Sequence, residues 1–215
     1  MRAMILAAGL GTRMRPLTNT MPKPLLEVGE KPLIVWHIEQ LRDTGFSEIV
    51  INVAYLGQQI IEYLGDGSRY GVKLYFSDEQ SEGALETAGG IVKALPLLSD
   101  TFLVVNGDVW TEYGYDASFQ LEEGSLAHLI LIENPKHNPE GDFQLNGSAE
   151  KYTFSGIGYY SKEMFSSLSY GKQPLAPLLF NAIEKKNLTT EYYDGEWHDI
   201  GTPERLIELN KILNV

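Results

Sequence analysis

The residues with the clearest chemical potential lie near the start of the chain, where an apolar run ends in two glycines and several cations. Residues 3–8 are followed by Gly9 and Gly11, and then by Arg13 and Lys23. Glycines after a strand allow a tight turn with exposed backbone N–H groups and no Cβ in the way of a ligand. Oriented N–H groups with cations beside them are a common means of holding a polyphosphate. The pattern therefore predicts a phosphate-binding turn.

The glycine spacing does not fit two common phosphate-binding motifs. A dinucleotide-binding fingerprint needs a third glycine where Met14 stands, and a Walker A loop needs a Gly-Lys-Ser/Thr ending that is absent here. An ordinary strand and turn with surface arginines is the simpler alternative. The full string GLGTRMRPLT at residues 9–18, with Pro-Lys-Pro at residues 22–24, argues against that alternative because it is far more specific than the two glycines.

Two carboxylates far apart in the sequence are candidates for a metal site. Asp108 follows the apolar run at residues 102–105, and open parallel sheets bind ligands beyond the carboxyl ends of their strands. Asp199 lies between Trp197 and Ile200 in an otherwise apolar stretch, where a carboxylate needs a partner. Two oxygen donors suit Mg²⁺, which keeps several waters and takes phosphate oxygens for the rest. A strand-end Asp can equally be a turn former or a helix cap, and that alternative stays open.

The elements that must position these residues follow from the apolar periodicity. Strands are predicted at residues 3–8, 48–54, 72–76, 102–105 and 127–133, with helices between the first four at 32–44, 56–64 and 86–98. This order implies right-handed crossovers and a parallel sheet. The second half is less regular: its predicted strands are 152–160, 189–193 and 197–200, and its predicted helices are 174–186 and 203–213. Asn146-Gly147 predicts a hairpin turn between strands.

Composition and charge limit the class of protein. The chain has 215 residues, 43% of them hydrophobic, and no cysteine, which fits one α/β domain in a reducing, cytoplasmic compartment. The net charge of −12 argues against nucleic acid or an anionic membrane as a partner. No apolar run approaches the ~20 residues of a membrane span. Residues 1–31 nevertheless hold five basic and two acidic side chains, so the sequence predicts a small anion at the glycine turn.

Four motifs taken together resemble the signature of the sugar-phosphate nucleotidyltransferase family. They are LAAGLGTR at residues 6–13, PKP at 22–24, NGD at 106–108 and WHDIGTP at 197–203, in the order that the family shows. The resemblance implies an α/β fold with a Rossmann-like, mixed but mostly parallel central sheet flanked by helices, of the GT-A-like type. It also implies a single domain over residues 1–215. In that domain, residues 1–125 would mainly bind the nucleotide, and residues 126–215 would mainly bind the sugar phosphate with a small hairpin insertion.

The resemblance also implies a role for each matching residue. Lys23, Arg13 and Asp108 would be catalytic, with Lys23 bridging the nucleotide α-phosphate and the sugar phosphate. Asp108 and Asp199 would bind Mg²⁺. The residues that would bind the nucleotide, besides Arg13 and Lys23, are Ala8, Gly9, Gly11, Thr12, Glu79, Thr87 and Asn106. The residues that would bind the sugar phosphate are Asp142, Gly156 and Lys23.

Further strings narrow the substrates that the resemblance implies. GDGSR at residues 65–69, LETAGG at 85–90, GDF at 141–143 and FSGI at 154–157 are similar to family members of peptidoglycan recycling that use UTP and N-acetylmuramate 1-phosphate. We therefore expect these two substrates, a Mg²⁺-assisted in-line displacement of pyrophosphate, no nucleic-acid or membrane partner, and a monomer or weak homodimer.

Two alternatives stay open at this point. One is a nucleotidyltransferase for another sugar 1-phosphate, of mannose or glucose type, with GTP, dTTP or CTP as the donor. The other is a non-catalytic sensor of nucleotide sugars. The stretch between Asp142 and Phe154 is shorter than in the family members compared, which predicts a tight hairpin over the sugar in place of a longer loop.

Overall fold

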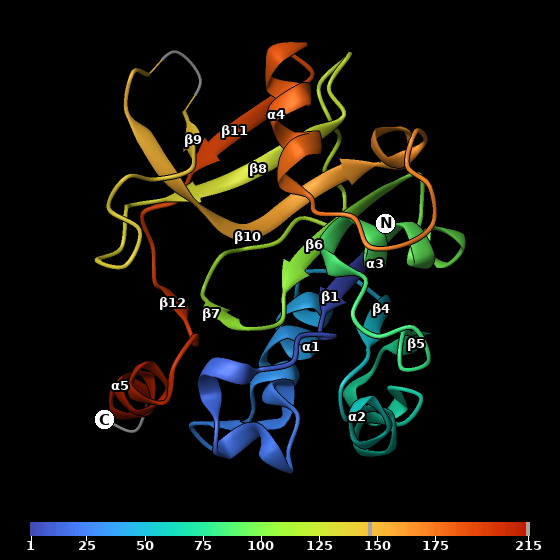
Figure 1. Cartoon of the computed structure of the whole chain (residues 1–215), viewed down its shortest axis with the longest axis vertical. Helices are drawn as coiled ribbons and strands as arrows, with labels where there is room; N and C mark the ends of the chain where they lie inside the picture. The colour runs from blue at the N-terminus through green and yellow to red at the C-terminus, as the bar shows by residue number, and fades with distance from the viewer. Residues whose placement is uncertain (146–147, 214–215) are drawn as a thin grey trace.

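A mixed sheet forms the centre of the computed structural model, which describes residues 1–145 and 148–213 (Figure 1). Within the described residues the sheet has eight strands. Seven follow the order β11-β8-β10-β6-β1-β4-β5, and β9 pairs with β10 at the side. The strands are β1 (Arg2–Leu6), β4 (Glu48–Val53), β5 (Lys73–Asp78), β6 (Thr101–Asn106), β8 (Ala127–Ile132), β9 (Phe143–Gln144), β10 (Lys151–Ser161) and β11 (Leu188–Tyr192).

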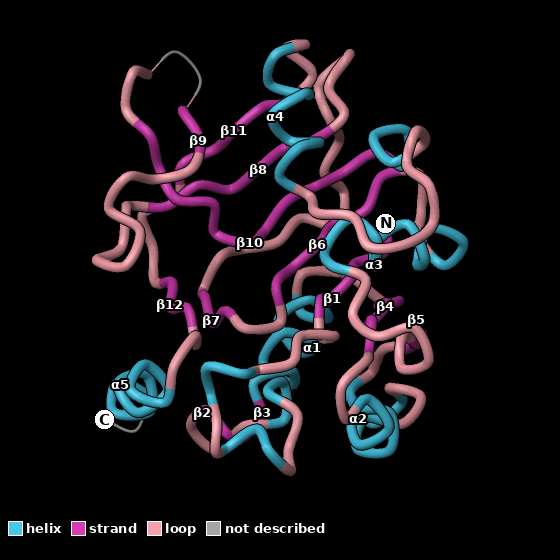
Figure 2. Tube along the Cα trace, viewed as in Figure 1, coloured by secondary structure: helices cyan, strands magenta, loops and turns pink. Residues whose placement is uncertain are grey.

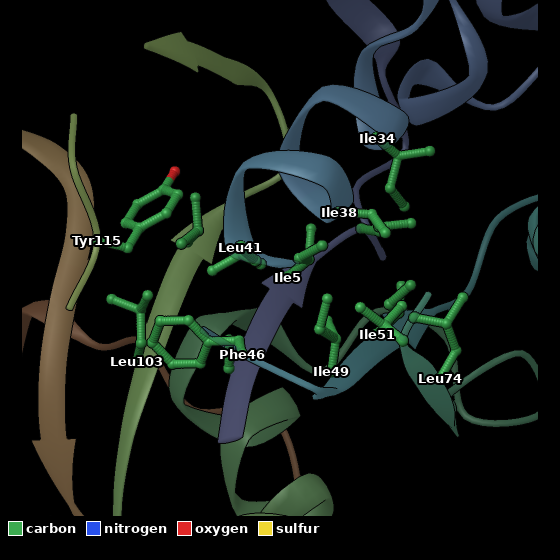
Figure 3. Packing of buried hydrophobic residues seen from close by; sticks show 14 of the residues in the cluster. Ile5, Ile34, Ile38, Leu41, Phe46, Ile49, Ile51, Leu74, Leu103 and Tyr115 are labelled. Atoms are coloured by element: carbon green, nitrogen blue, oxygen red, sulfur yellow. The ribbon is translucent and has the colours of Figure 1, made fainter. Parts of the chain in front are cut away.

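The first half of the chain builds the parallel part of this sheet. Strand β1 pairs in parallel with both β4 and β6, and β4 pairs in parallel with β5. Near-continuous apolar runs suit such strands because both of their faces are covered. Successive side chains point to opposite faces, so Ile5 and Ile51 pack against the helices of one face (Figure 3). Met4 and Val50 pack on the other face. The helices on the Ile5 face are α1 (Leu33–Asp43) and α2 (Gly57–Leu64).

The second half extends the sheet with strands of mixed direction. Strand β10 lies between β6 and β8 and is antiparallel to both, and β11 adds in parallel to β8 at the edge. Two helices, α3 (Glu86–Ala94) and α4 (Ala176–Glu184), supply apolar side chains to the core on the Met4 face. The predicted fold class, a mixed and mostly parallel sheet between helices, is the one observed.

A smaller cluster joins a segment of the first 33 residues to the C-terminal helix beside the sheet (Figure 2). The hairpin β2 (Glu27–Val28) and β3 (Lys31–Pro32) comes from the N-terminal segment. Strand β7 (Val109–Thr111) pairs with β12 (Trp197–Asp199), and the C-terminal helix α5 (Pro203–Leu213) follows. Their buried side chains form a third apolar core: Met14, Leu26, Val28, Leu33, Trp110, Ile200, Leu206 and Leu209.

The observed elements differ from the sequence-based ones in a few places. Strands β2, β3 and β7 were not predicted, because two or three residues carry too little periodicity to be recognised. Helix α3 ends at Ala94, and a 3₁₀ turn over Leu95–Leu97 replaces its predicted last turn, where Pro96 has no N–H to donate. Strands β9 and β10 form the predicted hairpin, while the predicted turn at Asn146-Gly147 lies outside the described residues. No described helix is both long enough and apolar enough to cross a membrane.

Candidate active site

The glycine turn after β1 lines a cavity of about 390 Å³ at the carboxyl end of the parallel strands. Gly11 has a φ of +61°, a conformation that favours glycine, and its carbonyl accepts hydrogen bonds from Thr18 Oγ1 at 2.7 Å and from Met14 N at 2.9 Å. No atom lies within 4 Å of where a Cβ on Gly9 would stand. Among the described residues, the backbone N–H groups of residues 8–12 have no hydrogen-bond partner. They are therefore free for a ligand.

Lys23 and Asp108 meet in this cavity although 85 positions separate them in the sequence. Lys23 Nζ donates to Asp108 Oδ2 at 2.8 Å, and both residues line the cavity. The Lys23 side chain is 11% exposed and that of Asp108 is 39% exposed, so the ammonium is largely shielded from water and the carboxylate is not. The 3₁₀ turn Lys23–Leu25, with Pro24 at its second position, fixes the backbone from which the lysine reaches.

The cations of the N-terminal segment divide into two groups. Arg13 lines the cavity together with Lys23. Arg2 instead pairs with Glu48 at 3.0 Å, and Lys31 pairs with Glu39. Arg15 is exposed and is not part of the cavity wall. Of the five early cations, two therefore line the predicted anion site. Arg2 and Lys31 form ion pairs elsewhere on the protein.

A buried polar network supports the same cavity, and sequence reasoning missed its centre, Asn52. Asn52 Oδ1 accepts from Ala7 N at 2.8 Å, and Asn52 Nδ2 donates to Glu79 Oε1 at 2.8 Å. Glu79 Oε2 accepts from Leu85 N at 2.9 Å. Asn52 and Glu79 are 3% and 1% exposed, yet each pairs its polar atoms as buried groups must. The polar residue at the end of an apolar strand was the signal available in the sequence.

Asn106, at the end of β6, lies between this cavity and a second one. Both cavities are lined by Asn106, Thr87 and Glu86, and the second has a volume of about 720 Å³. Gly156 has a φ of +80° where the register between β8 and β10 shifts, and a Cβ on it would lie 2.5 Å from Asn106 Nδ2. The predicted residues Asn106 and Gly156 are therefore neighbours, and only glycine at position 156 leaves room for the Asn106 amide.

Asp142 lines the second cavity, and its carboxylate is already hydrogen bonded within the protein. Oδ2 accepts from Phe154 N at 2.9 Å, and Oδ1 accepts from Asn138 Nδ2 at 3.1 Å. Each carboxylate oxygen has a second lone pair, so these bonds orient the group and leave it able to accept from a ligand.

Asp199 is close to Asp108 through the backbone, but its side chain lines another cavity. Ile200 N donates to Asp108 O at 2.9 Å, which fixes the two segments together. The Asp199 carboxylate pairs with Arg205 and with His137 at 3.3 Å, and it lines a third cavity of about 540 Å³. Asp199 Oδ1 is buried and has no hydrogen-bond partner in the described structure. It lies against Gly201, which lines the first cavity.

Metal-binding residues do not form a ready-made cluster in this arrangement. Among residues 1–145 and 148–213, no group of three or more His, Cys, Asp or Glu side chains is placed to hold a metal ion. His198 is packed on Trp110 at 5.8 Å between ring centroids and bonds Glu196 at 3.0 Å. A cation here would need oxygen ligands from a bound phosphate as well as from the protein.

His37 is a buried histidine close enough to Asp108 for that charge to act on it. It lies on α1 and is 1% exposed; no geometric hydrogen bond reaches its ring nitrogens among the described residues, although the Val109 backbone is close enough to act on its pKa. Burial lowers the pKa of His37 to about 4, although the nearby Asp108 carboxylate acts in the opposite direction. The imidazole is therefore neutral at physiological pH.

The glycine turn, the lysine–carboxylate pair and the strand ends form a candidate anion-binding site on an α/β sheet. Residues 2–143 match the family described as Nucleotidyl transferase, which is more than half of the chain, so the chain belongs to the nucleotidyl transferase family. The predicted family is thereby confirmed.

Individual relatives agree with this family. N-acetylmuramate alpha-1-phosphate uridylyltransferase of Neisseria meningitidis serogroup B is 52% identical over 97% of this chain and 96% of that protein. UTP–glucose-1-phosphate uridylyltransferase of Synechocystis is 40% identical over 63% of this chain, a match that spans 38% of that longer protein. The structure of CTP:phosphocholine cytidylyltransferase from Streptococcus pneumoniae shares the fold, with a TM-score of 0.77 and 23% identity over 99% of this chain and 98% of that one.

Proposed function

We propose that this chain transfers the uridylyl group of UTP to N-acetylmuramate 1-phosphate, giving UDP-N-acetylmuramate and pyrophosphate. The observation that carries the proposal is the cavity in which Lys23 Nζ lies 2.8 Å from Asp108 Oδ2 beside the free N–H groups of the glycine turn. The choice of substrates is supported by the Neisseria protein, which is 52% identical over 97% of this chain.

In the proposed reaction an oxygen of the sugar phosphate attacks the α-phosphorus of UTP, and the bond from that phosphorus to the β-phosphate oxygen breaks. The nucleophile is already an anion, so no general base is needed, and the obstacle is the repulsion between two anions. We assign Arg13 and the N–H groups of Ala8, Gly9, Gly11 and Thr12 to the triphosphate. We assign Lys23 to the α-phosphate and sugar phosphate together, because a compact ammonium can neutralise both.

The remaining assignments divide the site into a nucleotide side and a sugar side. Thr87 and Asn106 would contact the nucleoside, and Asp142 and Gly156 would contact the sugar phosphate. Glu79 already accepts two hydrogen bonds within the protein, so we assign it to positioning the wall of the nucleotide cavity. Residues 1–125 of a single domain would then bind mainly nucleotide and residues 126–215 mainly sugar phosphate.

Asp108 and Asp199 are the residues that we assign to Mg²⁺. The fit is supported by the buried, unpartnered Oδ1 of Asp199 and by the exposed part of Asp108, on backbone segments joined at 2.9 Å. When bound, the ion would neutralise phosphate charge. We expect Asp108→Asn to lose the activation by added Mg²⁺, measured as pyrophosphate release across a Mg²⁺ titration. Full activity of that variant in excess EDTA would remove the metal assignment.

Two further proposals concern the oligomeric state and the location of the enzyme. We propose a monomer or weak homodimer, which sedimentation of the purified chain would test. We also propose a cytoplasmic location, which the absence of cysteine supports because reducing compartments do not favour disulfides.

The decisive experiment is a matrix of donors and acceptors. Pyrophosphate release would be measured for UTP, CTP, GTP and dTTP, each with the 1-phosphates of N-acetylmuramate, N-acetylglucosamine, glucose and mannose. We expect the highest kcat/KM for UTP with N-acetylmuramate 1-phosphate. A different best pair would replace the proposed substrates within the same class. Binding of UTP without turnover of any acceptor would instead favour a nucleotide-sugar sensor.

A further inference from the structure

The second cavity has an unusual charge pattern for a site that holds a neutral sugar ring. Its described wall contains one cation, Lys151, and two carboxylates, Asp142 and Glu86. We propose that Lys151 determines the sugar specificity by pairing with a carboxylate on the sugar itself, the one on the lactyl ether of N-acetylmuramate. This inference rests on the proposed function and goes beyond it, because it names the group that would distinguish this acceptor from an otherwise similar N-acetylhexosamine 1-phosphate.

The charge of the acceptor is the first argument for this role. A sugar 1-phosphate with a lactyl carboxylate carries a second anion, and the cavity that receives it already contains two acidic side chains. A third carboxylate desolvated there without a cation would be repelled. Lys23 lines only the first cavity, with the phosphates. Lys151 is thus the one cation on the described wall that can offset the lactyl group.

The backbone of Lys151 is held firmly while its side chain is exposed. Its carbonyl accepts from Asn134 Nδ2 at 2.9 Å, and it stands opposite Gln144 in the β9–β10 pair. Gly141 packs so closely that a Cβ on it would lie 2.8 Å from the Lys151 carbonyl oxygen. Within residues 1–145 and 148–213 the Lys151 side chain forms no ion pair. The Lys151 backbone is therefore fixed in position, while its ammonium is free to pair with a ligand.

The rest of the cavity wall suits the remainder of such a sugar. Phe143 lies 6.2 Å from Phe154 and 5.5 Å from Phe180 between ring centroids, so three rings form an aromatic wall. Phe154 and Phe180 line the cavity, and Phe180 is 52% exposed on α4. Apolar rings of this kind pack well on the face of a sugar and on methyl groups, such as those of acetamido and lactyl substituents. The volume of about 720 Å³ lies within the range of small-molecule sites, about 300–1,000 Å³.

The test is a comparison of two acceptors that differ only in the lactyl group. Wild type, Lys151→Met and Lys151→Arg would be assayed with UTP and either N-acetylmuramate 1-phosphate or N-acetylglucosamine 1-phosphate. We expect Lys151→Met to lower kcat/KM for the first acceptor by about 10- to 100-fold, the size of one lost charge-assisted hydrogen bond. The value for the second acceptor should stay within about twofold, and Lys151→Arg should restore most of the difference. Lys211→Met, on the exposed face of α5, is the matched control and should change neither value.

The outcomes separate this inference from the proposed function. If wild type does not turn over N-acetylmuramate 1-phosphate at all, the proposed function fails, whatever Lys151 does. If wild type turns it over but Lys151→Met lowers both acceptors equally or neither, the specificity role is wrong while the function stands. Thermal melting of each variant tests whether misfolding is the cause. We expect unchanged melting temperatures, because an exposed side chain at a strand end contributes little to the core.

Discussion

At the scale of single residues, Lys23 is the side chain on which the proposed chemistry depends most. Its ammonium is 11% exposed and held by Asp108, so it is oriented before any substrate binds. Such preorganisation makes a cation more effective, because little rearrangement is needed when charge develops in the transition state.

We expect Lys23→Met to reduce kcat at saturating UTP and sugar phosphate by at least about 30-fold, equivalent to about 2 kcal/mol of barrier. Pyrophosphate release would be measured, with Lys185→Met as a control for loss of an exposed lysine. Turnover within threefold of wild type would show that Lys23 does not act on the reacting phosphates.

His37 gives a second residue-scale prediction, about stability and pH. Its pKa is about 4 in the folded chain and 6.5 as an ordinary value, so between these limits the unfolded chain binds a proton that the folded chain does not. The free energy of unfolding should therefore fall as the pH is lowered from 6.5 towards 4, by up to about 3 kcal/mol from this group.

Urea unfolding at several pH values would measure this effect. His37→Leu removes the titrating ring and should flatten the dependence relative to wild type, while the other three histidines remain in both proteins. Because the buried ring has no side-chain partner among the described residues, Leu should also cost little stability at neutral pH. Equal slopes for the two proteins would mean that His37 does not carry the pH dependence.

At the scale of elements, the Asn52 network joins three strands and a helix around the first cavity. Asn52 on β4 bonds Ala7 after β1, and Glu79 after β5 bonds both Asn52 and Leu85 before α3. Gly90 on α3 packs directly over this network. The position of the helix against the strand ends therefore depends on the absence of a side chain at Gly90.

Gly90→Ala should destabilise the chain although alanine is the better helix former. The new Cβ would lie 2.8 Å from Glu79 Oε1 and 2.9 Å from Asn52 Nδ2, and such overpacking typically costs about 1–3 kcal/mol. Gly114→Ala is the matched control, since nothing lies within 4 Å of its Cβ position. Chemical denaturation would compare the two variants, and KM for UTP should rise in Gly90→Ala alone. Identical unfolding midpoints would show that the Asn52 network accommodates the new methyl group without loss of stability.

At the scale of the whole molecule, the segment that follows the glycine turn packs against the C-terminal helix α5 in the third core. The third core brings Met14, just after the glycine turn, together with Ile200 and with Leu209 of α5. Because Ile200 follows Asp199, this core holds the glycine turn and the segment of the second carboxylate together.

Leu209→Ala should therefore affect both stability and activity. Leu209 is 0% exposed, and removing a buried Leu costs about 2–5 kcal/mol. Ile207→Ala on the same helix is the control, because Ile207 is 55% exposed and should change the free energy of unfolding by less than about 1 kcal/mol. Denaturation midpoints and kcat below the unfolding temperature would be compared. A stable Leu209→Ala protein would show that α5 is not needed to close the fold.

The local pattern of the sequence was enough to predict the glycine turn, the parallel strands and most helices. These features depend on neighbours a few positions apart, through apolar alternation, helix boundaries at proline and glycine, and the conformational freedom of glycine. The strand ends at Asn106 and Asp108 could also be placed near the turn, because parallel strands share one carboxyl edge.

Only the tertiary structure decided how the side chains pair across that edge. Asn52 bonds Ala7 over 45 positions, Lys23 bonds Asp108 over 85, and Asp199 faces His137 and Arg205 as well as Gly201. The antiparallel insertion of β10 between β6 and β8, which creates the second cavity beside Lys151, was likewise not predicted. The physical reason is that long-range contacts depend on packing and register among distant segments, which no local run of residues encodes.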